Sequence, residues 1–218
     1  MFGFRALLSQ LAGVLALFVL TAGCAAHAEF DEGFDYHAFT LPKDAEPPET
    51  ILVQEFFWYG CPHCDRIEPY VNALLADLPK GVAFQRIPAA LNPRWELHAR
   101  AYYAAQSLGV VERTHAAMFD AIHRQRRRLN DRDALAAFYA EHGVDQAAFK
   151  SHLGSFDMDF QIRRAKRDAN RYQVSSVPTF IVAGKYTTGP GVTGSNQRTM
   201  DVVRYLIDKE LKALNAGR

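Results

Sequence analysis

The chain has 218 residues, and its 25 Lys and Arg residues nearly balance its 24 Asp and Glu residues, for a formal net charge of +1 at pH 7. This balance argues against the strongly basic surface of a nucleic-acid-binding protein, so we predict no nucleic-acid partner. The basic run from His123 to Arg128 is interpreted as the solvated end of a helix, where cations complement the helix dipole. The length suffices for one domain with an insertion and a full hydrophobic core.

Residues 1–28 have the pattern of a cleavable secretory signal peptide. Arg5 supplies the positive charge, Leu11 to Leu20 is an apolar run, and Ala26 to Ala28 matches an A-x-A cleavage site. Cleavage after Ala28 removes one Arg and no acid, so the formal charge of the mature chain becomes zero. No later apolar run approaches the ~20 residues that span a bilayer. We therefore predict an exported, soluble mature protein that begins at Glu29.

A lipoprotein signal is the alternative interpretation of the same leader. The stretch from Leu20 to Cys24 resembles such a signal, and its use would keep Cys24 as an acylated N-terminus. Thr21 stands where that signal usually has leucine, which favours plain cleavage. After plain cleavage, Cys61 and Cys64 are the only cysteines of the mature chain.

Two strands and a helix are predicted after the leader. Ile51 to Trp58 is a buried strand rich in β-branched and aromatic residues, and Val82 to Ile87 is a second strand. Between them, Cys61 to Leu78 has helical patterning, with Pro69 in the interior. A proline in a helix interior removes a hydrogen bond and kinks the axis, which turns the first helical turn away from the core.

The middle of the chain is set apart by its lack of proline, because all ten prolines lie outside Arg94 to Val177. Helical patterns fill this stretch, and Asn130 is the expected N-cap of the third helix. The five predicted helices are Trp95 to Leu108, Val111 to Arg127, Asp131 to His142, Asp145 to Leu153 and Ser155 to Tyr172. They predict an all-helical insertion domain over residues 93–172.

Strands are expected again after the helical region. Val174 to Tyr186 has the pattern of a strand, a turn and a second strand. A loop at Gly189 to Gly191 then leads to a final helix that runs through Leu214, with Ser195 or Asn196 as its N-cap. The order β-α-β, helical insertion, β-β-α predicts an α/β, thioredoxin-like fold interrupted by an all-helical insertion domain. Residues 29–92 and 173–218 form its thioredoxin-like part.

Cys61-Pro62-His63-Cys64 is the motif that carries chemistry. It follows a strand and opens a helix, so Cys61 lies at a helix N-terminus, where free N–H groups and the helix dipole stabilise a thiolate. We therefore expect a depressed pKa for Cys61 and assign it as the sulfur that attacks or is attacked. Cys64, one turn further on, is placed to resolve a mixed disulfide from within the same chain. The spacing predicts a redox-active pair.

Two other roles of the cysteine pair fit the sequence less well. A structural zinc site usually needs four ligands with paired spacing, but there is no second C-x-x-C and the other histidines are scattered along the chain. We therefore predict no metal. A purely structural disulfide would close a two-residue loop, and so short a loop restrains little of the unfolded chain.

Three motifs in a fixed order carry a family resemblance. They are Glu55-Phe56-Phe57, the Cys61-to-Cys64 motif with Pro69 beyond it, and Val177-Pro178-Thr179-Phe180 late in the chain. Together they resemble the DsbA family of periplasmic thiol:disulfide oxidants. The resemblance runs over essentially the whole mature chain, including the Pro-free region, where that family keeps its helical domain.

The resemblance implies a role for each motif residue. Cys61 would be the nucleophilic sulfur and Cys64 the buried resolving one. Within the Pro62-His63 dipeptide between them, the histidine would give the thiolate a hydrogen bond or a positive charge. Pro178 would be a cis-proline that faces the cysteine pair. Val177 would offer its backbone N–H and C=O to a substrate segment that adds as an extended strand.

Glu55 is a charged residue in an otherwise apolar strand. A buried acid is costly unless it is paired, and Arg86 on the next predicted strand is the candidate partner. By resemblance, Glu55 matches the acid beneath the active site, and Arg86 falls where the family commonly has lysine. Because arginine stays protonated, a proton relay would run through Glu55 alone. The alternative is that Glu55 points to solvent at a strand edge. Glu68 is expected to be a solvated helix residue.

The sequence thus predicts a monomeric periplasmic oxidase that introduces disulfide bonds into unfolded exported proteins. Its redox centre is the Cys61–Cys64 disulfide, with no further cofactor. The resemblance implies reoxidation by a quinone-linked membrane oxidase of the DsbB type. One alternative is an isomerase, but the about 22 residues between Glu29 and Ile51 are too few for a dimerisation domain. The other alternative is a reductase, which export disfavours.

Overall fold

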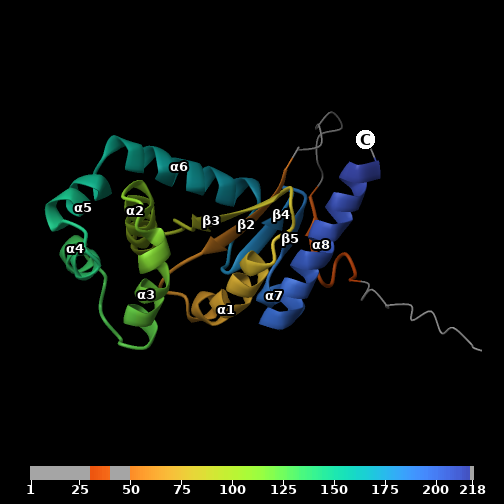
Figure 1. The fold of residues 1–218 in the computed structure, drawn as a ribbon, viewed down its shortest axis with the longest axis horizontal. Helices are drawn as coiled ribbons and strands as arrows, with labels where there is room; N and C mark the ends of the chain where they lie inside the picture. Colours follow the sequence, from red (N-terminus) through yellow and green to blue (C-terminus); the bar gives the residue numbers. More distant parts are fainter. Residues whose placement is uncertain (1–29, 40–49, 217–218) are drawn as a thin grey trace, which may run out of the picture.

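The computed structural model describes residues 30–39 and 50–216, so the predicted signal peptide and the lipidation alternative at Cys24 lie outside the described residues. Five strands form one mixed sheet in the order β1-β5-β4-β2-β3 (Figure 1). The strands are β1 (His37–Ala38), β2 (Ile51–Phe57), β3 (Val82–Pro88), β4 (Thr179–Val182) and β5 (Tyr186–Thr188). β2 and β3 run parallel, whereas β4 pairs antiparallel with both β2 and β5.

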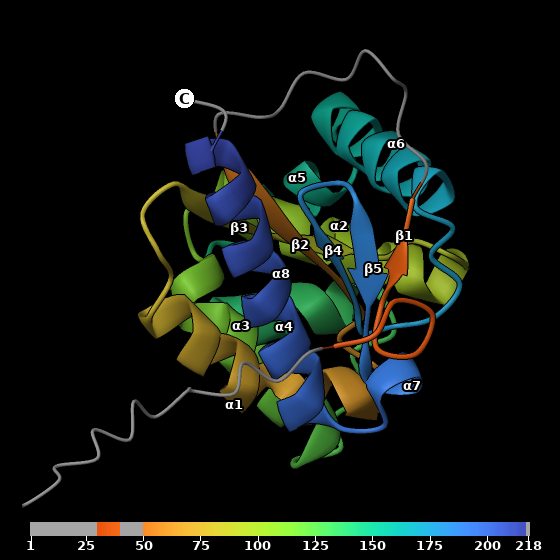
Figure 2. The same cartoon turned by 90° about the vertical axis from the view of Figure 1, so that its right-hand side faces the viewer.

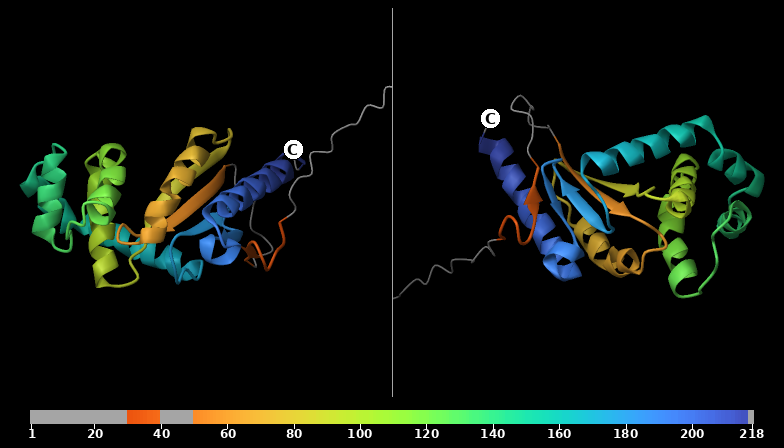
Figure 3. Two further views of the ribbon diagram at one scale, coloured as in Figure 1. Left: turned by 90° about the horizontal axis from the view of Figure 1, so that it is seen from below. Right: turned by 180° about the vertical axis from the view of Figure 1, so that it is seen from behind.

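Helices cover both faces of the sheet. On one face, α1 (Pro62–Ala76) connects β2 to β3 and packs beside α8 (Asn196–Ala216). The long helix α6 (Phe156–Arg171) runs across the other side (Figure 3). Successive side chains of a strand point to opposite faces of the sheet, so β4 contributes to a core on each face. Phe180 and Val182 join the core under α1 and α8, whereas Ile181 joins the opposite core. The central strands are therefore buried on both sides.

The helical insertion leaves the sheet after β3 and returns to it before β4. Its other members are α2 (Pro93–Ser107), α3 (Val111–His123), α4 (Arg132–Glu141) and α5 (Gln146–Leu153). The N-cap of α4 is Asp131 and not the predicted Asn130, because the Asp131 carboxylate accepts a hydrogen bond from the backbone N–H of Ala134 at 2.8 Å. Within the described ranges, no helix has the length and apolarity needed to cross a membrane.

Two predicted boundaries differ from the structure by four residues or more. α3 ends at His123 instead of Arg127, because Arg126 takes a φ of +56° and the chain turns out of the helix. The basic run thus starts at a helix end, as predicted. β4 begins at Thr179 instead of Val174, since the backbone N–H of Val174 donates to the carbonyl oxygen of Ala169 in α6 at 2.8 Å and not to a neighbouring strand. Residues 174–178 form the loop that approaches the cysteine pair.

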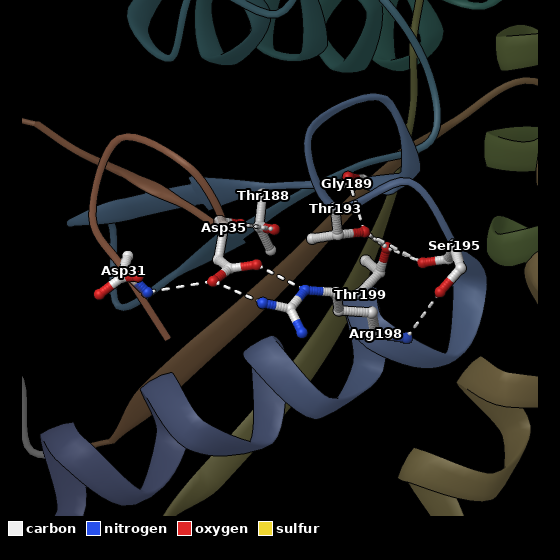
Figure 4. A network of polar contacts seen from close by, with 8 residues as sticks. All are labelled: Asp31, Asp35, Thr188, Gly189, Thr193, Ser195, Arg198 and Thr199. Carbon is white, nitrogen blue, oxygen red and sulfur yellow. Dashed lines mark hydrogen bonds and ion pairs between the residues drawn. The ribbon is translucent and has the colours of Figure 1, made fainter. Parts of the chain in front are cut away.

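The first described residues are tied to the end of the chain by a polar network (Figure 4). The buried carboxylate of Asp35 accepts hydrogen bonds from Nε and Nη2 of Arg198 at 2.7 and 2.9 Å. The hydroxyl of Thr188 donates to the Asp35 carbonyl at 2.7 Å. Beside this network, the edge strand β1 pairs with β5 (Figure 2), and the short helix α7 (Pro190–Thr193) follows β5. The sequence patterns predicted neither β1 nor α7.

Candidate active site

The Cys61–Cys64 pair lies where β2 gives way to α1. Cys61 is the N-cap residue of α1, and Pro62 occupies the start of the helix, where its missing N–H breaks no helical hydrogen bond. Cys64 is fully buried, whereas Cys61 keeps 8% of its surface exposed. Both cysteines are free thiols. The two sulfurs therefore differ in access, and Cys61 is the one that a second molecule reaches.

The two thiols also differ in acidity. The thiol of Cys64 donates to the Cys61 sulfur, and with the backbone N–H groups of Cys64 and His63 and the charge of His63 it lowers the pKa of Cys61 to about 6, against the effect of burial. Burial, and then the neighbouring Cys61, raises the pKa of Cys64. At pH 7, Cys61 is therefore mainly a thiolate and Cys64 a neutral thiol.

The side chain of His63 is exposed and stands away from the core of the site. Its Nδ1 lies 3.0 Å from Nη2 of Arg66 on the next turn of α1. The hydrogen bond that His63 gives to the Cys61 sulfur comes from its backbone N–H, and its side chain contributes through charge. Pro62 beside it is also exposed. Both residues of the dipeptide therefore border the accessible side of the sulfur.

The loop before β4 brings a backbone carbonyl to the active-site sulfur. The sulfur of Cys61 lies 3.5 Å from the carbonyl oxygen of Val177, to which it donates a hydrogen bond only in its protonated form. The peptide bond between Val177 and Pro178 is cis, as predicted. Gly189 packs against this loop so closely that a Cβ atom at that position would lie 2.7 Å from the carbonyl oxygen of Pro178. A residue without a side chain is therefore required behind the loop.

Glu55 is fully buried in β2, so the alternative of a solvent-facing strand edge is wrong. Its predicted partner is present, because Nε of Arg86 on β3 lies 3.4 Å from Oε2 of Glu55. Burial, and then the negative charge of Glu68, raises the pKa of Glu55 to about 8, and the attraction of Arg86 only partly opposes this rise. Glu55 is therefore mainly protonated at pH 7.

The expectation that Glu68 is solvated is wrong. Glu68 lies on the inner face of α1 with 9% of its surface exposed, and its Oε2 accepts a hydrogen bond from Nη2 of Arg86 at 3.1 Å. The helical insertion also covers Glu68, and a prediction from the periodicity of α1 alone does not take this neighbour into account. Arg86 therefore bridges two acids, Glu55 and Glu68.

Two histidines of α3 reach the segment that precedes Cys61. Nδ1 of His115 lies 2.9 Å from the hydroxyl of Tyr59, and Nε2 of His123 lies 2.7 Å from the Tyr59 carbonyl oxygen. In the sequence, both are among the histidines that are scattered along the chain. Their eight-residue spacing places them two turns apart on one helix face, together with Phe119, and this spacing is the signal that could have grouped them.

The comparisons with known proteins decide the family. The family model for a DSBA-like thioredoxin domain matches residues 52–206. The thiol:disulfide interchange protein DsbA of Azotobacter vinelandii is 38% identical over 186 residues, which cover 85% of this chain and 87% of that protein. DsbA of Pseudomonas aeruginosa strain PAO1 is 36% identical over 203 residues, which cover 93% of this chain and 96% of that protein. The chain belongs to the DsbA family.

A solved DsbA structure agrees with this assignment. The crystal structure of Pseudomonas aeruginosa DsbA superposes with a TM-score of 0.79 at 37% sequence identity, covering 85% of this chain and 97% of that one. The predicted thioredoxin-like fold with a helical insertion is therefore confirmed. As a DsbA-family member, the protein is an enzyme, a thiol:disulfide oxidoreductase that introduces disulfide bonds into substrate proteins. DsbA chemistry runs through a redox-active disulfide and needs no further cofactor.

A groove of about 910 Å³ adjoins the cis-proline loop of this DsbA-family chain. Its lining includes the polar residues Gln173, Ser175 and Ser176 and the apolar residues Pro178 and Val192. Polar side chains and exposed backbone thus meet apolar groups there. Among the described residues, no group of three or more His, Cys, Asp or Glu side chains has the arrangement of a metal site.

Proposed function

We propose that this DsbA-family protein acts in the periplasm, where Cys61 exchanges disulfides with unfolded exported proteins and Cys64 is its partner in the intramolecular disulfide, able to resolve a mixed disulfide by attack on Cys61. The observation that carries these roles is the asymmetry of the two sulfurs. Cys61 is partly accessible and has a pKa of about 6, whereas Cys64 is fully buried with a raised pKa. A stable, accessible thiolate is both the better leaving group and the stabilised product of reduction.

The first step is attack by a substrate thiolate on the Cys61 sulfur of the Cys61–Cys64 disulfide. The bond between the two cysteines breaks, a substrate–Cys61 bond forms, and Cys64 departs with the electron pair. Because the pKa of Cys64 is raised, this sulfur takes up a proton. Glu55 supplies that proton, since it is buried close enough for its charge to act on Cys64 and is itself mainly protonated at pH 7.

The second step releases the oxidised substrate. A second substrate thiolate attacks the substrate sulfur of the mixed disulfide, and Cys61 leaves as a thiolate. The substrate has then lost two electrons and gained one disulfide bond, and the Cys61–Cys64 pair has gained those two electrons. A low pKa of Cys61 favours this step, because the rate of exchange rises as the pKa of the leaving thiol falls.

Val177 and Pro178 are the proposed substrate-binding residues. The carbonyl of Val177 already faces the Cys61 sulfur at 3.5 Å, and the groove beside Pro178 offers room for an extended segment. Hydrogen bonds to the Val177 backbone would hold a substrate chain without reading its sequence. Pro62 and His63, the exposed residues between the two cysteines, are proposed to lie beside the bound substrate. This mode of binding suits an enzyme with many unfolded clients.

The proposed location and partner follow from the leader and from the redox balance. Residues 1–28 are proposed to be a signal peptide cleaved after Ala28. Each turnover leaves two electrons on the Cys61–Cys64 pair, so a second redox protein must remove them. We assign this role to a quinone-linked membrane oxidase of the DsbB type. The working unit is proposed to be the monomer.

Two cysteine variants test the roles of the sulfurs. Cys61→Ser should abolish oxidation of a reduced peptide, and Cys64→Ser should accumulate mixed disulfides between Cys61 and substrate, visible on a non-reducing gel. Full oxidase activity in Cys61→Ser would refute the mechanism. Equilibration of the wild-type pair with a glutathione buffer separates the alternatives, because a pair as reducing as cytosolic thioredoxin would reassign the protein as a reductase or isomerase.

A further inference from the structure

His115 belongs to the helical insertion, yet both of its ring nitrogens contact the segment that carries the active site. Nδ1 lies 2.9 Å from the hydroxyl of Tyr59, and Nε2 lies 3.2 Å from Oε1 of Glu68. Tyr59 precedes Cys61 by two residues, and Glu68 lies one helical turn beyond Cys64. His115 is 7% exposed, so these contacts are shielded from water.

The environment of the ring fixes where its proton lies. Burial raises the pKa of Tyr59, so the hydroxyl stays protonated and donates to Nδ1 of His115. Burial lowers the pKa of His115, although Glu68 works against that shift. The ring is therefore neutral, with its single proton on Nε2. Nε2 lies 3.2 Å from Oε1 of Glu68; the two atoms do not complete a hydrogen bond at this geometry, but the N–H dipole lies close enough to stabilise the carboxylate charge.

Glu68 and Glu55 compete for one cation and for one proton. Arg86 contacts Oε2 of Glu68 at 3.1 Å and Oε2 of Glu55 at 3.4 Å. The only other donor that contacts either carboxylate within the described residues is His115, and it contacts Glu68 alone. Two buried acids that share one cation cannot both ionise freely. The acid with the additional donor keeps the negative charge, and the other acid keeps the proton.

We propose that His115 is a positioning residue of the redox reaction: by placing its Nε2–H beside Glu68 from the helical insertion, it keeps the shared proton of the two buried acids on Glu55. His115 touches neither sulfur and acts only through these acids. The inference rests on the proposed function, in which Glu55 gives a proton to Cys64. It assigns the helical insertion a part in the chemistry in addition to covering the site.

The directions in which the pKa values of Glu68 and Glu55 are shifted agree with an ionised Glu68 and a protonated Glu55. Burial works against ionisation of Glu68, but the contacts with His115 and Arg86 outweigh it and hold the pKa of Glu68 below its usual value. The pKa of Glu55, without such a donor, rises to about 8. The titratable or charged groups that face His115 come from every element around it: Tyr59, Glu68 on α1, Arg86 on β3, Tyr102 on α2 and Glu112 on α3.

The test is a titration of the two carboxyl groups by NMR in reduced full-length mature protein labelled with ¹³C at glutamate carboxyls. Glu55→Gln and Glu68→Gln identify the two signals. In wild-type protein at pH 6, we expect Glu55 to be protonated and Glu68 ionised. In His115→Leu, the pKa of Glu68 should rise by about one unit or more, and Glu55 should move toward the ionised form at pH 6.

Matched variants separate the lost donor from lost packing. His115→Gln keeps an N–H donor near the position of Nε2 and should restore the wild-type titration. His98→Leu removes another buried histidine, one whose Nε2 bonds to the Leu129 carbonyl, and should leave both acids unchanged. If His115→Leu does not fold, His115→Asn, which is too short to reach Glu68, takes its place.

Two outcomes would overturn the proposal. One is a His115→Leu or His115→Asn titration equal to that of the wild type. The other is a shift in His115→Gln as large as that in His115→Leu, which would show that the shift comes from lost packing and not from the lost N–H group. The titration needs no substrate, so its result does not depend on the proposed function. Failure of the proposed function would instead appear as an absence of peptide oxidation by wild-type protein. If the role of His115 and the proposed function are both correct, His115→Leu should also slow formation of the mixed disulfide below pH 7, and His98→Leu should not.

Discussion

The depressed pKa of Cys61 predicts a pH-dependent difference in stability between reduced wild-type protein and the Cys61→Ser variant. A thiol with a pKa near 8.5 in the unfolded chain and about 6 in the folded protein stabilises the fold at every pH at which the folded-state thiol is ionised. The sign follows directly: the contribution is fully present above the unfolded pKa and is lost as the pH falls through the folded pKa. Serine does not ionise, so the variant lacks it.

The size of the effect follows from the two pKa values. The thiolate should contribute nearly nothing at pH 5, about 1.4 kcal/mol at pH 7 and about 3 kcal/mol at pH 8.5. The raised pKa of Glu55 also makes stability depend on pH, but it does so in both proteins and cancels in the difference. The excess stability of the wild type over Cys61→Ser should therefore grow steadily between pH 5 and pH 8.5.

Urea unfolding of both reduced proteins measures this difference. Trp58 and Trp95 stack with their ring centroids 4.8 Å apart beside the active-site segment, so their fluorescence should change on unfolding. Oxidised wild-type protein is the control, because a disulfide has no thiolate and its stability should lack the additional rise. Parallel pH profiles for reduced wild type and Cys61→Ser would refute the assignment of Cys61 as a stabilised thiolate.

Three further substitutions have expected outcomes. Glu55→Gln should stabilise the protein by about 1–3 kcal/mol at pH 8 and by little at pH 4, because a raised acid pKa means that stability is lost as the pH rises toward about 8; urea unfolding at the two pH values checks this. Gly189→Ala should slow peptide oxidation about tenfold or more in a stopped-flow assay, because the new Cβ displaces the Pro178 carbonyl. Gly191→Ala is the control, because a Cβ there meets nothing within 4 Å, and it should match the wild type in that assay. Pro178→Thr should slow release of bound substrate, so mixed disulfides should persist in a quenched time course; unchanged lifetimes would count against a substrate-binding role for this loop.

Local sequence pattern was enough to predict most of the site that lies within one strand–helix unit. The apolar run of β2, the turn and the helical start of α1 placed Cys61 at a helix N-terminus, and neighbouring residues supply most of what stabilises its thiolate. The pairing of Glu55 with Arg86 also followed, because β2 and β3 are adjacent parallel strands and these two residues lie in register.

What pattern could not predict depends on how the insertion packs against the sheet. Glu68 is polar on a helix, and nothing in its neighbours along the chain shows that α3 covers it. His115 and His123 reach Tyr59 across more than fifty residues of sequence, through a contact that only the folded arrangement creates. The early start predicted for β4 has a similar cause, since the apolar pattern of residues 174–178 reflects contact with the core and not strand pairing.

The salt bridge between Asp35 and Arg198 and the pairing of β1 with β5 join the two ends of the chain at one sheet edge. A chain that is synthesised from its N-terminus cannot make these contacts until residues near 198 have also been made. The β2–α1–β3 unit with the cysteine pair has no such requirement and can assemble earlier. The contacts between these two parts of the chain thus form only when the chain extends to residue 198, even if the redox motif has already folded.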